Sequence, residues 1–280
     1  MKKLLSANLS RLGKSKLFWM LESTCFLLGA AAYFLVAYNT RNLGLGYIQF
    51  NAQGYFYLPI LYLPVGIAIF SCFFFGTEYS DGTIRNKLIV GHSRKAIYLA
   101  NLLTTVCVLG LFLLACYVPV FIIGIPFAGK EVVTCVKMQP WRIGNVLLHL
   151  TEYGALFVLL STLDSNKARN VLVCIMTALL LIVLGVSAYG RYSEPEFVQQ
   201  VVYLPDGGME LKDGIPNSQY LTGTSRIIVR WIATILPTGS AMMSADKNLS
   251  FMWQVPLTAT LVTALLTLGG IRLFKRKDIK

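Results

Sequence analysis

Two groups of ionisable residues interrupt a sequence that is otherwise rich in apolar side chains. In the first, residues 77–96, Glu78 is followed by an Asp81-Gly82 turn, a basic stretch and a second basic pair that begins at Arg94. In the second, His149 precedes Glu152 by three residues, so both lie on one face of a helix. The first group indicates either a solvated loop or a docking element for another protein. The second could form a hydrogen bond or pass a proton.

The sequence lacks motifs for catalysis, nucleotide binding and metal binding. Gly13-Lys14-Ser15 imitates the end of a phosphate-binding loop, but Asn8 stands where that loop needs a glycine. There is neither a Gly-x-Ser-x-Gly nucleophile turn nor a His-Glu-x-x-His metal helix, and two histidines cannot build a multi-histidine site. We therefore expect no enzyme, and no cofactor or metal in this chain. Any energy would come from another chain or from an ion gradient.

The elements that must position these residues follow from composition. The chain has 280 residues with 25 Lys and Arg against 13 Asp and Glu, a formal charge of +12; 55% of its residues are hydrophobic and 14% are charged. Soluble domains average about 25% charged residues, so this composition excludes a soluble enzyme and indicates a protein that faces lipid. The basic residues lie in short stretches between apolar runs, which excludes a nucleic-acid partner.

Six charge-poor windows have the length of about 20 residues that a membrane-spanning helix needs. They centre on residues 17–38, 57–76, 101–126, 143–163, 171–189 and 255–274. Most lysines and arginines fall in residues 1–16, 77–96, 164–170 and 272–280, which predicts that both termini are cytoplasmic. The basic start and first apolar run also fit a secretory signal peptide, although Glu22 and the length of the run disfavour that alternative.

The predicted fold is an all-α integral membrane protein with six transmembrane helices. Residues 1–16 form a cytoplasmic interfacial helix with an apolar stripe of Leu5, Leu9 and Leu12, and residues 17–189 hold the first five spans. Residues 190–254 form an extracellular segment, with a strand near 198–204 and a helix at 226–236 that either dips into the membrane or packs on the ectodomain. Residues 255–280 form the sixth span and a basic C-terminus.

The loop after the second span resembles that of the ABC-2 type permeases, the membrane subunits of ATP-binding-cassette exporters. The resemblance rests on Glu78, Gly82-Thr83, Arg85-Asn86-Lys87 and Ser93-Arg94, on the six-span plan, and on an apolar stretch with Leu-Pro at residues 228–239. It implies that this loop contacts a separate ATPase subunit, which carries the ATP and Mg²⁺. The implied contact residues are Glu78, Asp81, Gly82, Thr83, Arg85, Lys87, Ser93 and Arg94.

The resemblance further implies a bacterial multi-pass protein of the cytoplasmic membrane that works with a second permease subunit, identical or similar. The spans offer few charges for a small polar solute, so the expected substrate is amphipathic: a peptide, a lipid-like molecule or a hydrophobic drug. Export of an antimicrobial peptide, or immunity to one, is the leading expectation, and it rests on the resemblance alone.

Alternatives remain open at His149 and Glu152. An intramembrane carboxylate is costly, so the two residues either line the substrate route or form an interhelical hydrogen bond, for example to Tyr33, Tyr117 or a Ser or Thr. Two other functions also remain: an ion-coupled secondary transporter that uses the pair as a proton relay, and a non-transporting membrane sensor or scaffold.

Overall fold

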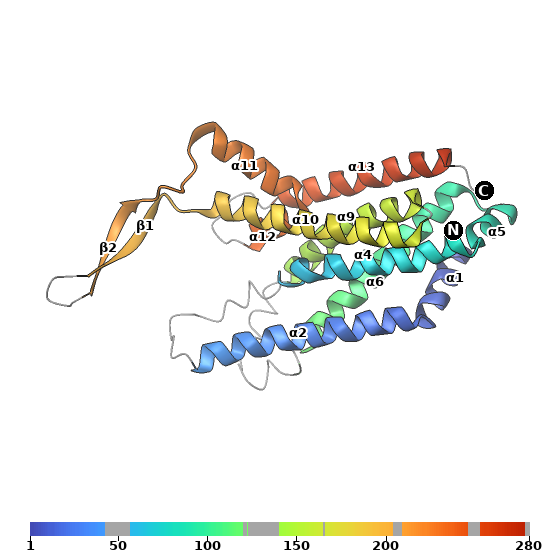
Figure 1. Cartoon of the computed structure of the whole chain (residues 1–280), viewed down its shortest axis with the longest axis horizontal. Helices are drawn as coiled ribbons and strands as arrows, with labels where there is room; N and C mark the ends of the chain where they lie inside the picture. The colour runs from blue at the N-terminus through green and yellow to red at the C-terminus, as the bar shows by residue number, and fades with distance from the viewer. Residues whose placement is uncertain are drawn as a thin grey trace.

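The computed structural model describes residues 1–42, 57–119, 122, 140–164, 166–203, 209–245 and 253–277. Figure 1 shows the long helices side by side in one bundle, with α1 and α5 at one end and the hairpin β1–β2 projecting from the other. We call these the α5 end and the hairpin end. The elements are α1 (Lys2–Gly13), α2 (Lys16–Asn42), α4 (Pro59–Ser80), α5 (Thr83–Ile89), α6 (Arg94–Pro119), α9 (Pro140–Leu163), α10 (Lys167–Ser193), β1 (Phe197–Tyr203), β2 (Met209–Pro216), α11 (Gly223–Ile235), α12 (Pro237–Ala245) and α13 (Gln254–Arg276).

Six helices among the described residues are long and apolar enough to cross a membrane, namely α2, α4, α6, α9, α10 and α13. They confirm the expected number of spans. α6 begins at Arg94, whereas the charge-free window predicted a start at Asn101. The difference arises because that window excludes charged residues, although Ser93 Oγ accepts a hydrogen bond from Ala96 N at 3.2 Å and so caps the helix earlier. Of the expected end of this span, residues 120–121 and 123–126 lie outside the described residues.

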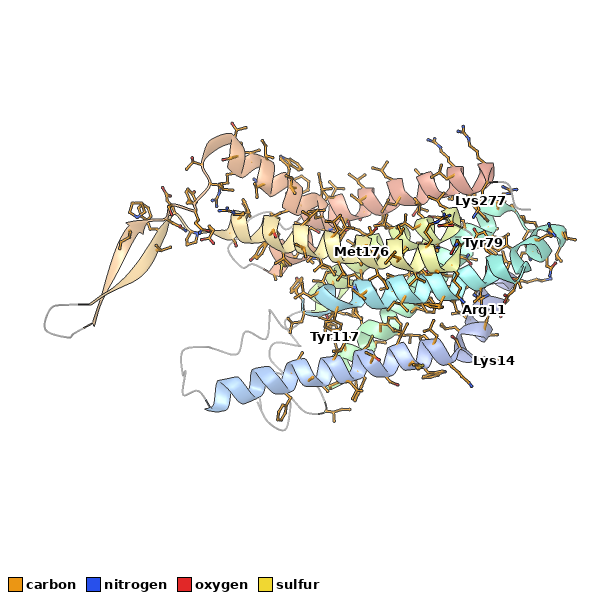
Figure 2. All side chains as sticks on the ribbon, viewed as in Figure 1. Arg11, Lys14, Tyr79, Tyr117, Met176 and Lys277 are labelled. Atoms are coloured by element: carbon orange, nitrogen blue, oxygen red, sulfur yellow. The ribbon has the colours of Figure 1, made fainter. Side chains whose placement is uncertain are left out.

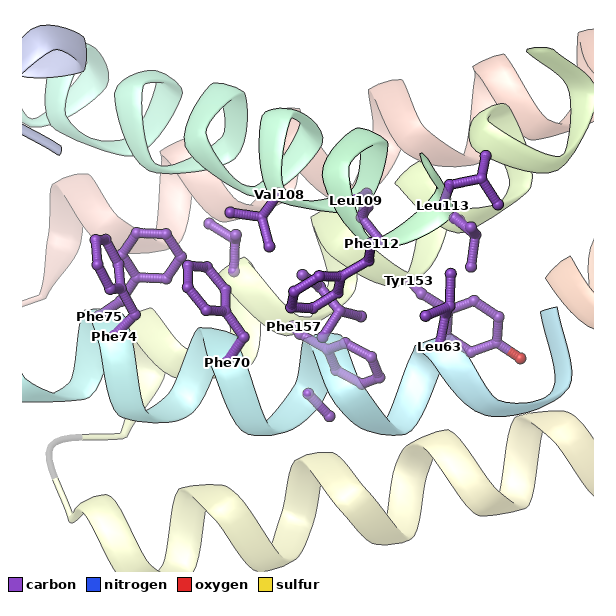
Figure 3. Close-up of a cluster of buried hydrophobic side chains, with 14 of the residues drawn as sticks. Leu63, Phe70, Phe74, Phe75, Val108, Leu109, Phe112, Leu113, Tyr153 and Phe157 are labelled. Atoms are coloured by element: carbon purple, nitrogen blue, oxygen red, sulfur yellow. The ribbon is translucent and has the colours of Figure 1, made fainter. Parts of the chain in front are cut away.

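The centre of the bundle is formed by α4, α6 and α9. In these helices 61%, 56% and 61% of the spanning window is buried, against 22%, 17% and 22% in α2, α10 and α13. Aromatic rings fill the space between α4, α6 and α9 (Figure 3): Phe70 stacks on Phe74 with ring centroids 4.8 Å apart and meets Phe112 edge-on at 6.4 Å. The peripheral helices therefore expose apolar faces, as helices in contact with lipid do.

Glycines allow two peripheral helices to approach closely. A Cβ at Gly185 of α10 would lie 2.7 Å from the backbone nitrogen of Gly239 in α12, and a Cβ at Gly29 of α2 would collide with the backbone of Cys116 in α6. Only backbone-to-backbone contact fits at both crossings. Small residues at helix crossings are the usual means of close packing within a membrane.

α1 packs across α6 at the α5 end of the bundle. Its apolar stripe was expected at Leu5, Leu9 and Leu12, but the buried residues are Leu4, Asn8 and Leu12. The stripe was predicted to lie along the membrane surface, and that remains a prediction. The side of α1 that packs on the bundle also carries Asn8, which is buried with hydrogen-bond partners on α6.

The hairpin end departs from a purely helical fold. The strand expected near residues 198–204 is β1, which pairs antiparallel with β2 from Phe197↔Pro216 to Tyr203↔Met209. A helix was expected at 226–236, and α11 spans Gly223–Ile235. Pro237 follows that helix and begins α12, which turns by 103° from α11. Proline suits the first position of a helix because its missing N–H would have no helical partner there.

Candidate functional site

Glu78 lies at the end of α4 between two cations from different elements. Its Oε1 is 2.6 Å from Arg11 of α1 and 2.6 Å from Lys87 of α5. The Glu78 side chain is fully buried, while Arg11 and Lys87 keep 37% and 18% of their side-chain surface exposed. One acid therefore neutralises only one of the two cations that it binds.

Further hydrogen bonds extend this ion pair to α6. Asn8 of α1 accepts from Lys87 Nζ at 3.5 Å, and its own Nδ2 donates to Asn101 Oδ1 at 3.1 Å and to Thr104 Oγ1 at 3.2 Å. Arg11 donates to the carbonyl of Phe74 at 2.7 Å and lies 3.7 Å from the centroid of that ring. The α5 cluster, defined as Asn8, Arg11, Glu78, Lys87, Asn101 and Thr104, thus joins α1, α4, α5 and α6.

The turn into α5 depends on local backbone geometry. Gly82 has a φ of +66°, a left-handed conformation that favours glycine, and Thr83 Oγ1 donates to the Glu78 carbonyl at 3.2 Å. Ile84 is buried and fixes α5 against the bundle. At its other end, α5 is followed by Gly91, with a φ of +91°. The short helix is therefore bounded by two glycine turns and packs on the bundle through Ile84.

Arg94 connects this segment with the end of α13. Its Nη1 donates to the carbonyls of Phe274 and Lys275, at 3.0 Å each, and also to that of Lys277. Lys277 Nζ in turn donates to the carbonyl of Thr162 at 2.7 Å. Arg94 and Lys277 thus donate to carbonyls that helix ends leave without a helical partner. Figure 2 shows Arg11, Lys14, Tyr79 and Lys277 at the α5 end.

The sequence-predicted contact residues separate by exposure. Asp81, Gly82, Arg85 and Ser93 are exposed, Thr83, Lys87 and Arg94 are half-buried, and Glu78 is buried. Burial takes the Glu78 side chain away from any surface that a partner could touch here. Two further residues, which we call the α5 tip, escaped the sequence reasoning: Ile89 and Val90 each expose 76% of their surface. In the sequence, the only indication of this exposed pair is that two apolar residues stand directly before Gly91.

His149 and Glu152 lie together in α9, as their spacing predicted. His149 Nδ1 is 2.9 Å from Glu152 Oε1 and 2.9 Å from Ser240 Oγ of α12. Next to them, the hydroxyls of Tyr153 and Thr238 are 2.6 Å apart. All five side chains are buried, and together they form what we call the α12 cluster. The interhelical hydrogen bond left open by the sequence therefore exists, and its partner is a serine rather than Tyr33 or Tyr117.

Some polar atoms beside the α12 cluster lack partners. Both amide atoms of Asn145, one turn before His149, and Nε2 of His149 are buried without a hydrogen bond among the described residues. Buried polar atoms are normally paired, so these three have capacity for a further polar group. Within the same residues, no three His, Cys, Asp or Glu side chains gather closely enough to hold a metal ion.

An exposed ion pair connects α9 with α10 at the α5 end. Arg169 Nη2 donates to Asp164 Oδ1 at 2.8 Å. This guanidinium lowers the pKa of the Asp164 carboxyl from its ordinary value of 3.8 to about 2. The Asp164–Arg169 pair therefore bridges only the short turn between α9 and α10.

The comparisons with known proteins agree with this architecture. A search of curated proteins gives no match. The family described as "ABC-2 family transporter protein" matches residues 4–185, a stretch that covers α1, the first four spans and most of α10. With six candidate membrane spans and a match over more than half of its length, this chain belongs to the ABC-2 family of transporter proteins, whose members are membrane components of transport systems.

Proposed function

We propose that this chain is the permease subunit of an exporter that moves an amphipathic substrate across the bacterial cytoplasmic membrane, driven by a separate ATPase subunit. The α5 tip is the observation that carries the proposal. Ile89 and Val90 are exposed on a helix that is otherwise fixed by Ile84 and the α5 cluster. Exposed apolar side chains on a rigid element, ringed by polar residues, are typical of a protein contact.

The ATPase contact would combine the α5 tip with the exposed polar residues around it. Asp81, Gly82, Arg85 and Ser93 are accessible, and Thr83, Lys87 and Arg94 are partly so. Glu78 would act from inside as a positioning residue, because it holds α5 against α1. ATP and Mg²⁺ would bind to the partner, and this chain would supply the docking surface.

Movement of α5 would reach the spans through side-chain hydrogen bonds. Lys87 and Asn8 connect α5 to α1 and α6, and Arg94 connects the following helix to the end of α13. An ATPase can shift the permease between two states only if it contacts them differently, so the docking element must transmit displacement without bending. The packing of Ile84 and the bonds of Lys87 to Glu78 and Asn8 support that role for α5.

The substrate route would pass the α12 cluster. Asn145 and His149 offer unpaired polar atoms inside the bundle, which suits the polar side of an amphipathic molecule. Glu152 would tune this surface through His149. An antimicrobial peptide is the substrate class that we favour, with a second permease subunit completing the route.

The proposed orientation has both termini in the cytoplasm. α1, α5 and the end of α13 share one end of the bundle, and exposed basic residues such as Lys14, Arg85 and Lys95 lie there. An excess of Lys and Arg in short loops marks the cytoplasmic side.

The test is co-purification of an ATPase from native membranes in mild detergent. We expect the wild-type chain to bring down a nucleotide-binding chain at about one per permease subunit. The double variant Ile89→Ser, Val90→Ser should lose at least tenfold of that chain, whereas a matched pair at the hairpin end, Ile227→Ser with Ile228→Ser, should retain it. Absence of any ATPase with the wild-type chain, or unchanged recovery with the α5-tip variant, would reject the proposal.

A separate variant tests the substrate route. Glu152→Gln keeps the side-chain shape and an oxygen that can accept from His149 Nδ1, but removes the acid. We expect altered transport of the peptide with unchanged ATPase co-purification. Normal transport at all pH values would remove Glu152 from the route.

A further inference from the structure

Arg226 in the first turn of α11 occupies an unusual site at the hairpin end. Its guanidinium carbon lies 4.5 Å from the ring centroid of Tyr220 and 5.0 Å from that of Tyr192. Tyr192, at the end of α10, is itself buried with Ala233. Two aromatic rings therefore flank the guanidinium of this half-buried arginine.

The guanidinium of Arg226 has a hydrogen-bond donor without a partner. Nη1 is buried without a hydrogen-bond partner, and Arg226 forms no ion pair with any residue that the structure describes. Glu194, the acid that follows α10, instead accepts from Asn217 Nδ2 at 2.9 Å. A buried cationic donor without an acceptor is costly, so the site is suited to an external anion.

The backbone adds to the same electrostatic preference. α11 begins at Gly223, its N-cap Thr222 makes no side-chain capping bond, and no acid lies in its first turn. N–H groups in the first turn of a helix and the positive end of its dipole both favour an anion. Arg226 belongs to that same turn, so backbone and side chain act at one place.

The surface beside this site is apolar. Ile227, Ile228, Trp231 and Ile235 each expose more than half of their surface, while Ala233 and Thr234 face the bundle. α11 then bends by 103° into α12, so it enters the bundle without continuing across it. A helix with this exposed apolar side would lie with that side in acyl chains and its first turn near the head groups. In that arrangement Arg226 would lie at the depth of the lipid phosphates.

We propose that Arg226, held by Tyr192 and Tyr220 at the N-terminus of α11, binds the phosphate of a phospholipid head group from the outer leaflet. The apolar side of α11 accommodates the acyl chains of the same molecule. This site needs neither the ATPase contact nor the substrate route, while its assignment to the outer leaflet rests on the proposed orientation. It also lies beyond residues 4–185, the part of the chain that matches the family.

The test measures lipid binding to the whole chain by native mass spectrometry after removal of endogenous lipid. The two probes are phosphatidylglycerol and a monoglucosyl diacylglycerol with the same acyl chains, which lacks the phosphate. We expect wild-type protein to bind phosphatidylglycerol at least tenfold more tightly. Arg226→Gln should bring that ratio close to one, and Arg226→Lys should leave it intermediate, because lysine keeps the charge but loses the planar fork.

The matched control is Arg191→Gln. Arg191 is an exposed arginine near the same end of α10, so its replacement removes the same charge, and the ratio should stay within twofold of wild type. The thermal unfolding of each variant checks that the fold is intact. The proposal is overturned if Arg226→Gln keeps the wild-type ratio, if the wild-type chain does not distinguish the two lipids, or if millimolar inorganic phosphate displaces phosphatidylglycerol, which would identify a site for a free anion.

Discussion

The α5 cluster and the α12 cluster are both polar groups at the boundaries of apolar helices, but they differ in charge and in reach. The α5 cluster has two cations around one buried acid and joins four elements. The α12 cluster has one imidazole beside one acid on the same helix, and it reaches only α12. The first connects the chain between sites far apart in sequence, whereas the second anchors one short helix.

This difference separates two mechanical roles. Arg11 and Lys87 of the α5 cluster are partly exposed, so water still solvates their charges. Their ion pairs with Glu78 can therefore hold α1 and α5 to α4 without the full cost of burying a charge. The side chains of the α12 cluster are buried. Their hydroxyl and imidazole hydrogen bonds hold α12 in one orientation against α9. Removal of one side chain should therefore lower the free energy of unfolding more at the α5 cluster, where two cations lose their shared acid.

The largest effect is expected at Glu78. Glu78→Ala leaves Arg11 and Lys87 facing each other without their shared acid, which should lower the free energy of unfolding by roughly 3 kcal/mol. Unfolding in mixed micelles measures it. The control is Glu196→Ala, an exposed acid directly before β1, which should change stability by less than about 0.5 kcal/mol. A loss below about 1 kcal/mol at Glu78 would remove the contrast between the clusters.

A smaller effect is expected at His149. His149→Leu deprives the buried Glu152 of its hydrogen bond and α12 of one anchor, at a cost of about 2 kcal/mol. Adding Glu152→Leu should recover part of that stability, because two apolar side chains leave no polar group unpaired. The unfolding free energies of the two single variants and the double variant form the cycle. A double variant less stable than either single variant would show that the pair contributes through something other than its mutual bond.

Ser240 tests the anchor on α12 alone. Ser240→Ala removes the hydroxyl bonded to His149 and should cost about 1 kcal/mol. Ser244→Ala is the matched control, because that hydroxyl bonds only within α12, to the carbonyl of Ser240 at 3.0 Å. Equal losses at the two serines would contradict the anchoring role. Comparison of the two thermal unfolding curves decides it.

The smallest effect is expected at Asp164. Its pKa is lowered from 3.8 to about 2 by Arg169, so its contribution is present above about pH 4 and disappears as the pH falls toward 2. Since the pair is largely exposed, Asp164→Asn should lose less than about 0.5 kcal/mol at pH 7. Unfolding of wild type and variant at pH 7 and pH 3 should show the gap narrowing at the lower pH. A widening gap would reverse the sign of the linkage.

Hydropathy predicted the parts of the fold that depend on short stretches of chain. Six apolar windows gave six helices, since the length and charge content of a window decide whether a helix can span a membrane. The spacing of His149 and Glu152 likewise placed them on one face. α12 was not predicted because its small residues show no apolar period, and its position depends on packing against several other helices, chiefly α10, α9 and α11.

Long-range pairing could not be predicted from local patterns. The hydrogen bonds from Asn8 to Asn101 and from Arg11 to Glu78 join residues that are 93 and 67 positions apart in the sequence. No residue near Asn8 in the sequence indicates that it is buried. Glu78 was predicted at the ATPase contact, whereas its burial depends on Arg11 of α1 and Lys87 of α5, which reach it from other elements. The same holds for the α5 tip, whose exposure depends on how α5 is oriented against the bundle.

The α5 tip also has a kinetic consequence. Ile89 and Val90 sit among exposed basic residues, including Arg85 and Lys95, on a chain with a net charge of +12. If an ATPase docks there, long-range attraction to an acidic surface would set how fast the two proteins meet, and burial of the apolar pair would set how long they stay together. Added salt should then slow association while leaving the residence time nearly constant, and Ile89→Ser should shorten the residence time at every salt concentration.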